Sequence, residues 1–190
     1  MQLTKGANLA LPASRTVSVT CTWTPRPGLE ADLSALLLAG GRVRGDSDFV
    51  FYNQPASAGR QVVHAGRRTA AGVTDRIDVD LAAVDDAVDT VAFAVSVDGG
   101  PVAGLGPVRA AVVSGSGEPL AAFTMDGLST ETAAVVVELY RRGAQWKVRA
   151  VGQGYHDGLA GLARDFGVDV VDEPPGTDWR HPPVPAGYEL

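Results

Sequence analysis

The fold is decided by Ala133-Ala134-Val135-Val136-Val137-Glu138-Leu139-Tyr140 and, after Arg142-Gly143-Ala144, by Trp146-Lys147-Val148-Arg149-Ala150-Val151. The alanines of the first run suit a helix, but its three consecutive valines have branched β-carbons that favour a strand. A short connection that contains glycine is typical of a β-hairpin. In the second run, apolar and charged side chains alternate, as in a strand with one buried face. We therefore predict two antiparallel strands here.

The same period of two recurs along the first two thirds of the chain. Apolar side chains alternate in segments 17–23, 77–81, 91–97 and 108–112, and both faces of segment 49–52 are apolar or aromatic. Turn-forming residues separate these segments, as at Asp98-Gly99-Gly100-Pro101. Many short strands with frequent turns predict a mainly β fold, an antiparallel β-sandwich with a few peripheral helices.

One helix is expected near the C-terminal end. Its apolar face is formed by residues at helical spacing, namely Leu159, Leu162, Ala163 and Phe166. Asp157 is placed to cap the first turn, and Gly167 stands where a helix commonly ends. The prediction is therefore a short amphipathic helix on the outside of the sandwich.

The length of 190 residues favours one domain. We expect a sandwich domain over residues 1–171 and a proline-rich tail over residues 172–190. Proline lacks the N–H that a central strand needs, so this tail is expected to lie extended over the surface or to be disordered.

Composition narrows the functional classes. The formal net charge of -6 argues against a general nucleic-acid-binding protein, which needs a basic face. The single cysteine, Cys21, permits no intrachain disulfide, and its place among alternating apolar residues predicts a buried side chain. The first residues lack a signal-peptide pattern, and no apolar run approaches the ~20 residues that span a bilayer. We expect a cytoplasmic protein that is not an integral membrane protein.

Patterns for catalysis are missing from the sequence. The three histidines lie far apart, outside Gly-x-Ser-x-Gly or His-x-x-x-His patterns, and no glycine-rich phosphate loop ends in Lys-Ser or Lys-Thr. The protein is therefore not expected to be an enzyme. A nucleotide pocket formed by Trp146, Tyr155 and His156 is a remaining alternative, although packing in the core and hairpin explains these aromatic residues better.

Oxygen-bearing side chains near turns are the main candidates for a binding site. A calcium ion takes six to eight oxygen ligands at ~2.4 Å, and loops at one end of a sandwich can bring such groups together. Aspartates are also ordinary turn residues, which is the competing interpretation. Asp75 and Asp80 lie on either side of Ile77 in the predicted strand around it. The candidate metal ligands are Glu30, Asp32, Asp46, Asp48, Asn53 and Asp75.

Several longer motifs occur in order along the chain. They include Leu3-Thr4-Lys5-Gly6-Ala7-Asn8, Ser47-Asp48-Phe49-Val50-Phe51-Tyr52-Asn53, Glu138-Leu139-Tyr140-Arg141 and Ala150-Val151-Gly152-Gln153-Gly154-Tyr155. From Leu3 to about Val171, the chain resembles the TerD domain family of tellurium-resistance and general stress proteins. The resemblance implies a bacterial, cytoplasmic β-sandwich with peripheral helices. It also implies calcium binding in acidic loops and no established enzymatic activity.

The sequence departs from the family pattern at one loop. Where the family usually has His-x-Gly-Asp-Asn followed by an acidic run, this chain has His64-Ala65-Gly66-Arg67-Arg68, and the run shrinks to Asp75. Arginine stays protonated and only donates, so it cannot ligate Ca²⁺. Either the arginines pair with Glu30, Asp32, Asp46 or Asp48 in place of the metal, or they turn outward.

Two functional hypotheses follow from this departure. In the first, a cytoplasmic stress-response protein binds Ca²⁺ weakly, with a site surviving at Asp46, Asp48 and Asn53. In the second, the protein is a metal-independent interaction module of a stress complex, with Arg67 and Arg68 replacing the cation. Protein partners in a stress-response complex, including a membrane-associated one, are compatible with the resemblance, whereas a nucleic-acid partner is not expected.

Overall fold

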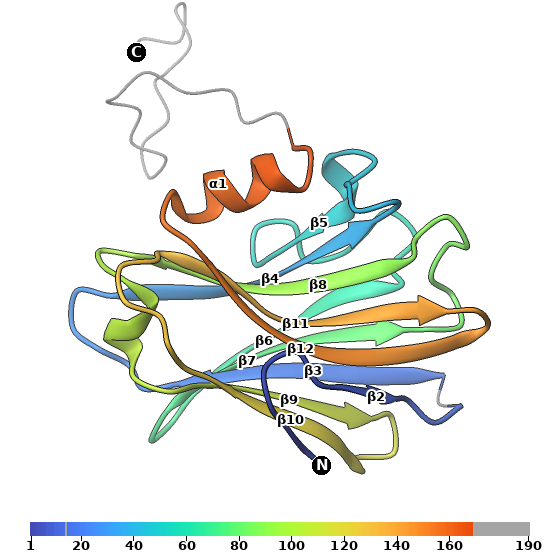
Figure 1. The fold of residues 1–190 in the computed structure, drawn as a ribbon, viewed down its shortest axis with the longest axis horizontal. Coiled ribbons are helices and arrows are strands. Elements are labelled where there is room, and N and C mark those ends of the chain that lie inside the picture. The colour runs from blue at the N-terminus through green and yellow to red at the C-terminus, as the bar shows by residue number, and fades with distance from the viewer. Residues whose placement is uncertain (14, 169–190) are drawn as a thin grey trace, which may run out of the picture.

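Two β-sheets of six strands each stack face to face in the computed structural model, which describes residues 1–13 and 15–168 (Figure 1). The β3 sheet contains, in spatial order, β1 (Gln2–Leu3), β10 (Pro119–Met125), β9 (Val108–Ser114), β3 (Thr16–Trp23), β7 (Val73–Asp80) and β6 (Val62–Thr69). The β8 sheet contains β2 (Asn8–Ala10), β12 (Gln145–Tyr155), β11 (Ala133–Arg142), β8 (Thr90–Asp98), β4 (Glu30–Leu38) and β5 (Phe49–Val50). All pairs are antiparallel except β1 with β10. The predicted antiparallel β-sandwich is confirmed.

The predicted hairpin forms β11 and β12, in the β8 sheet. The pairing register shifts between Val135 and Val137, which places Val136 and Val137 in the core between the sheets and Val135 on the opposite face. All three valines are buried because that opposite face is covered as well. The run of valines therefore reflects burial on both faces of a strand.

The first ten residues contribute a short strand to each sheet. β1 pairs with β10 at the edge of the β3 sheet, and β2 pairs with β12 at the edge of the β8 sheet. The amino group of Met1 also donates to the Leu120 carbonyl at 3.0 Å. This segment covers one edge of both sheets, which would otherwise expose unpaired backbone groups.

The predicted helix is α1 (Gly158–Asp165), and it covers part of the outer face of the β8 sheet. It packs Leu162 against a cluster that includes Leu36, Ala92 and Val135, on the outer face of the sheet. Gly167 ends the helix with a φ of 78°, and its N–H donates to the Arg164 carbonyl at 3.0 Å. The helix prediction is confirmed.

Asp157 stands at the predicted N-cap position of α1, but the capping hydrogen bond expected from its side chain is not formed. Its side chain makes no capping hydrogen bond, and its carboxylate lies 3.7 Å from Arg164 Nη1 on the next turns of the helix. The Asp157 carboxylate thus lies near Arg164 on the helix surface and does not accept a hydrogen bond from the first N–H groups of α1.

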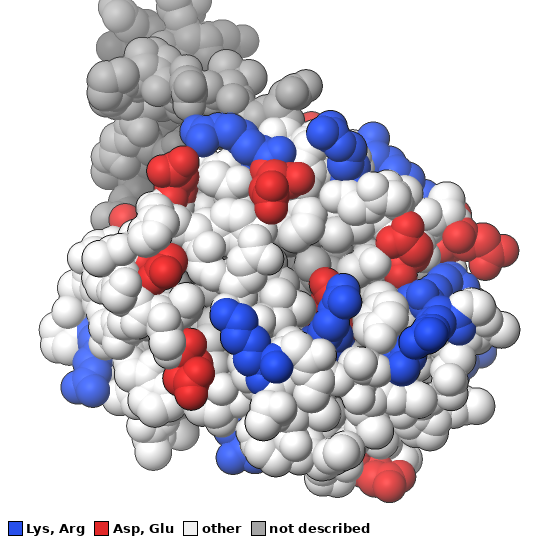
Figure 2. All heavy atoms as spheres, viewed as in Figure 1, with Lys and Arg blue, Asp and Glu red and all other residues white. Residues whose placement is uncertain are grey.

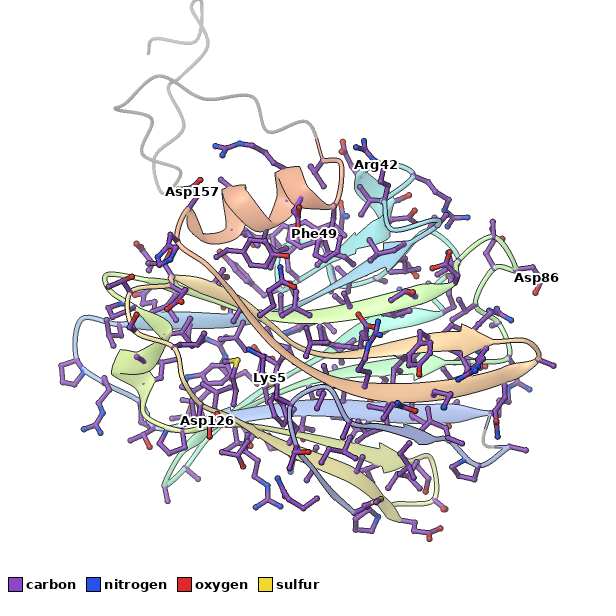
Figure 3. The ribbon with its side chains drawn as sticks, in the orientation of Figure 1. Lys5, Arg42, Phe49, Asp86, Asp126 and Asp157 are labelled. Atoms are coloured by element: carbon purple, nitrogen blue, oxygen red, sulfur yellow. The ribbon has the colours of Figure 1, made fainter. Side chains whose placement is uncertain are left out.

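The aromatic strand predicted at 49–52 is shorter than expected. β5 ends at Val50, and a turn follows in which the Tyr52 side chain is exposed, with 56% of its surface accessible. Phe49 and Phe51 stack at 4.9 Å between ring centroids, and Phe49 packs in the cluster beneath α1 (Figure 3). Stacking of the two rings thus replaces the alternation expected of a longer strand.

Two 3₁₀ turns complete the described elements, η1 (Asp46–Asp48) and η2 (Val102–Leu105). The predicted tail at 172–190 and the last residues of the predicted domain 1–171 lie outside the described residues. Within residues 1–13 and 15–168, no helix has the length and apolar character needed to cross a bilayer.

Gly99 offers a test of how closely two turns approach each other. Its φ is 86°, and a Cβ added there would lie 2.1 Å from the Gly28 carbonyl oxygen. We expect Gly99→Ala to lower the free energy of unfolding by about 2–3 kcal/mol, measured by urea denaturation, because strain and a backbone clash add together. Gly117→Ala is the matched control, since its φ is 89° with nothing within 4 Å of an added Cβ. Equal losses in the two variants would contradict the clash.

Candidate functional site

Asp75 is a carboxylate enclosed in the interior at the edge of the sandwich. It shares the inward-facing positions of β7 with Ile77 and Val79, and its side chain has no exposed surface. The β6–β7 register places it directly opposite Arg67. An isolated buried carboxylate is strongly unfavourable, so the side chains and N–H groups around Asp75 must compensate its charge.

Both oxygens of Asp75 are occupied. Oδ2 accepts hydrogen bonds from Arg67 Nη2 at 2.8 Å and from the backbone N–H of Leu33 at 3.2 Å. Oδ1 accepts from the backbone N–H of Arg76 at 3.0 Å. His64 Nε2 lies 2.7 Å from Oδ1, but the approach has no hydrogen-bond geometry and Nε2 makes no hydrogen bond within the described residues. The carboxylate is thus held by one guanidinium, two amides and a close imidazole.

Arg67 joins the two sheets at this edge. From β6 its Nη2 reaches β4, where it donates to Asp32 Oδ1 and to the Ala31 carbonyl, both at 2.7 Å. Its guanidinium carbon also lies 5.6 Å from the centroid of the Trp23 ring. Burial lowers the pKa of Arg67, but the bonds to Asp75 and Asp32 outweigh burial and raise it. The arginine is therefore a fixed positive charge between two carboxylates.

A hollow of about 960 Å³ opens beside this cluster. Its lining includes Trp23, Tyr52, His64 and Arg67, with Glu30 and Asp32 among the acidic groups. Aromatic and charged groups thus meet in one concave surface, a common form of ligand site.

Asp48 is held by a different arginine. Arg44 donates Nε to Oδ2 at 2.8 Å and Nη2 to Oδ1 at 2.9 Å, a bidentate pair, and its Nη1 bonds to Asp85 at 2.8 Å. The side-chain bonds to Asp48 and Asp85 raise the pKa of Arg44. The N–H of Ala87 and then Arg44 lower the pKa of Asp85. Both oxygens of Asp48 are therefore engaged in this pair.

Glu30 lines the same hollow as Asp32, whereas Asp46 and Asn53 do not line it. Asp46 and Asn53 are exposed in η1 and in the turn after β5, and Glu30 is exposed at the start of β4. Gln54 Nε2 donates to the backbone oxygens of Asp46 and Phe49, both at 2.5 Å, so it stabilises the turn.

The pairing of β5 with β4 separates Asp48 from Asp32 along the length of β4. Phe49 pairs with Leu36, four residues beyond Asp32 on β4. At about 3.4 Å per residue, the Asp32 and Asp48 positions are at least roughly 14 Å apart. Within residues 1–13 and 15–168, no three Asp, Glu, His or Cys side chains are grouped to hold a metal. As arranged, the six predicted ligands do not fit a calcium ion, because arginines occupy Asp32, Asp48 and Asp75.

Sequence reasoning missed Arg44 and the contact of Trp23 with Arg67, and it included Asp75 without predicting its burial. Arg44 lies four positions before Asp48, and this spacing was the signal for their ion pair. Trp23 was assigned only to the core face, although it also supports Arg67. Asp75 has the same period-two parity as Ile77, which was a signal for its burial.

Two other predictions concern Cys21 and the alternative nucleotide pocket. Cys21 is fully buried, and burial, followed by the charge of Asp75, raises its pKa well above the ordinary value. The predicted buried, unreactive thiol is thus supported. The pocket of Trp146, Tyr155 and His156 is not formed: Trp146 lines a hollow near Leu11, whereas the other two line a hollow beside α1.

The described chain is thus a β-sandwich protein of two six-stranded sheets in which arginines hold Asp32, Asp48 and Asp75. The sequence profile of the TerD domain matches residues 1–166. Tellurium resistance protein TerD of Serratia marcescens is 36% identical over 189 residues, covering 90% of this chain and 98% of that protein. General stress protein 16U of Bacillus subtilis is 35% identical over 152 residues, covering 74% and 79%. The chain belongs to the TerD domain family.

A solved structure agrees at the level of the fold. It is described as a homologue of telluride resistance protein from Streptomyces coelicolor A3(2), with a TM-score of 0.62 and 19% sequence identity. The alignment covers 80% of this chain and 96% of that one.

Proposed function

We propose that this protein acts in resistance to tellurite or other chemical stress as a cytoplasmic binding protein without enzymatic activity. The support is its family membership and the names of its relatives, which are tellurium resistance and general stress proteins. The described structure adds a site of carboxylates, an imidazole and a guanidinium beside an open hollow. Such a site suits recognition of a ligand or a partner surface.

The observation that carries the proposal is the position of Arg67. Its Nη2 lies 2.7 Å from Asp32 and 2.8 Å from Asp75, so one fixed cation bridges carboxylates from β4 and β7. A bound metal would supply a positive charge at such a place. We therefore favour the metal-independent interaction module, with Arg67 in the role of the cation. Arg68 is exposed on β6 opposite Thr74 and takes no part in this bridge within the described residues.

Weak binding of Ca²⁺ stays a prediction. It requires Asp48 to leave Arg44, or Asp32 and Asp75 to leave Arg67, before their oxygens can face a metal. A unit charge ~4 Å from another contributes about 4 kcal/mol at an effective dielectric of 20, so each arginine opposes a divalent ion strongly.

Calorimetric titration of Ca²⁺ into chelator-treated protein separates the two forms of the proposal. For the wild type we expect no binding heat and no melting shift at millimolar Ca²⁺. Arg67→Asn removes the opposing charge and adds an amide oxygen, so we expect at least a tenfold gain in Ca²⁺ affinity. Arg68→Asn is the matched control, and circular dichroism confirms that each variant is folded. Wild-type binding at micromolar Ca²⁺ would overturn the metal-independent form.

The cellular role has its own test. A strain that lacks the gene is expected to lose tolerance to tellurite or to another toxic chemical, and the wild-type gene should restore it. Failure of both the deletion and the complementation to change tolerance to any of these agents would contradict a stress role, whatever the calcium result.

A further inference from the structure

The outer face of the β3 sheet is open, in contrast to that of the β8 sheet. Within the described residues, Figure 1 shows α1 on the β8 sheet and no α-helix on the outer face of the β3 sheet. Short side chains point outward at the centre of the open face, and they include Ser18, Thr20, Thr22 and Ala111. They alternate along the strands with core residues such as Val19. The face thus has a floor of hydroxyl-bearing and small side chains.

Arginines surround this floor. In the register of the sheet, Arg109 of β9 is the neighbour of Thr22, and Arg68 of β6 is the neighbour of Thr74 on the same row. Neighbouring strands are about 4.8 Å apart, so three spacings place Arg68 and Arg109 roughly 14 Å from each other. Arg76 points outward from β7, two residues from Thr74. A single short segment of a partner can therefore reach all three arginines.

A fourth arginine reaches the same face from the turn before β6. Arg60 lines a hollow of about 470 Å³ together with Thr20, Arg76 and Asp78. Its φ is 54°, and it is the only residue other than glycine with a positive φ in residues 1–13 and 15–168. Glycine adopts this conformation without strain, so the chain holds a charged side chain here at a cost in stability. Strain of this kind is concentrated at functional positions.

The carboxylates of this face are already engaged. Asp78 accepts hydrogen bonds from Ser18 Oγ and from Arg76 Nε, both at 2.7 Å. Asp80 accepts from Arg15 Nε at 3.2 Å. Both acidic groups are thus neutralised by their own neighbours and leave the other arginines of the face unopposed.

The four arginines, named the arginine face, are Arg60, Arg68, Arg76 and Arg109. Within the described residues, all but Arg76 lack an ion pair and a side-chain hydrogen bond, and all four are exposed. Figure 2, on the side of the molecule that it shows, has acidic and basic side chains interspersed. The arginine face instead gathers positive charge on a chain whose formal net charge is -6. Such a local excess favours an anionic partner.

We propose that the arginine face binds an acidic segment of another protein through its aspartate and glutamate carboxylates. The planar guanidinium group matches a carboxylate in bidentate geometry. A long nucleic acid fits less well, because its phosphates would run past the face onto a chain that is otherwise acidic. An anionic bilayer also fits less well, since the outward positions of β3, β7 and β9 hold no aromatic side chain to insert.

This surface is separate from the hollow beside Arg67. The β6–β7 register places Arg67 opposite Asp75 on the inward-facing side, whereas Arg68 lies opposite Thr74 on the outward-facing side. The proposal therefore does not depend on the proposed function, and either one can fail without the other.

A labelled peptide of about ten glutamates is the probe, because it extends over roughly 30 Å and can cross the face. Fluorescence anisotropy is expected to show saturable binding at low salt and release at about 1 M salt, where charges are screened beyond about 3 Å. Nuclear magnetic resonance of the bound protein is expected to show shifted amides in β3, β7 and β9. No binding at low salt, or shifts confined to the other sheet, would overturn the proposal.

Matched charge variants locate the binding surface. Arg68→Gln with Arg109→Gln is expected to weaken peptide binding about tenfold, since two contacts between exposed charges are removed. Arg26→Gln with Arg142→Gln removes the same charge from exposed positions elsewhere and is expected to leave the affinity unchanged. Equal losses in the two double variants would contradict binding at the arginine face.

Arg60→Gly separates binding from folding. We expect the peptide affinity to fall about threefold while the melting temperature does not fall, because glycine relieves the strain at a φ of 54°. An affinity equal to that of the wild type would contradict the binding role of Arg60 and of the hollow that it lines.

Two other polyanions test the class of partner. An oligouridylate of matched length, and vesicles of phosphatidylcholine and phosphatidylserine in equal parts, are expected to bind more weakly than the peptide. Tighter binding of either one, lost in the Arg68→Gln with Arg109→Gln variant, would overturn the assignment to an acidic protein segment.

Discussion

Replacing Arg67 with alanine is expected to lower the free energy of unfolding by about 3–5 kcal/mol, since it leaves the fully buried Asp75 without its guanidinium. At roughly 2–4 °C per kcal/mol for a chain of this size, the melting temperature should fall by about 10 °C. Calorimetry and urea denaturation at pH 7 measure the two quantities. The bonds to Asp32 and Ala31 across the sheets are lost in the same variant, so the edge between β4 and β6 is expected to loosen first.

Two further variants test whether the loss of stability comes from the missing guanidinium of Arg67. Arg68→Ala removes the neighbouring exposed arginine and should change stability by no more than about 0.5 kcal/mol. Arg67→Lys keeps the charge but not the planar group that contacts three acceptors and stacks on Trp23, so an intermediate loss is expected. If Arg67→Ala were as stable as the wild type, Asp75 would not depend on this cation.

Phe93→Ala is expected to cost about 3–5 kcal/mol through a cavity between the sheets. Phe93 has no exposed surface, and it pairs with Ala35 on β4 and Val137 on β11, so neighbours on both sides belong to ordered strands. Strands that are hydrogen bonded on both edges move little to fill a hole, which keeps the loss near the upper part of the range. Urea denaturation with an unchanged m-value checks this result.

Tyr52→Ala provides the contrast for the core variant. Tyr52 has 56% of its surface exposed, so its truncation should change stability by less than about 1 kcal/mol. A similar loss for both variants would show that aromatic content, rather than the position in the core, sets the effect.

Much of the fold could be predicted because local pattern and tertiary burial agree. The hairpin of β11 and β12 and the helix α1 were both expected from periodicity, and both occur within a few residues of the predicted bounds. The strand at 49–52 failed because stacking between Phe49 and Phe51 and a turn at Tyr52 override a short apolar run. Local propensity is a weak guide where side-chain contacts of this kind decide the backbone.

The site was harder to predict because its geometry depends on strand register. Pairing of Arg67 with Asp32 was one of the expected alternatives, and the structure contains it. Pairing with Asp75 follows only from the β6–β7 register, which includes an irregularity between His64 and Gly66. The separation of Asp32 from Asp48 follows from the point at which β5 meets β4. Neither quantity can be read from residue spacing alone.

The strands β1 and β2 have a consequence for synthesis of the chain. Within the described residues, β1 pairs with β10 and β2 pairs with β12, and the ribosome makes both partners much later than β1 and β2. Each sheet therefore keeps an unpaired edge until most of the polypeptide has emerged. Contacts so distant in sequence close slowly, and open edges favour association with other chains. A nascent chain of this kind has reason to engage a chaperone until β12 is available.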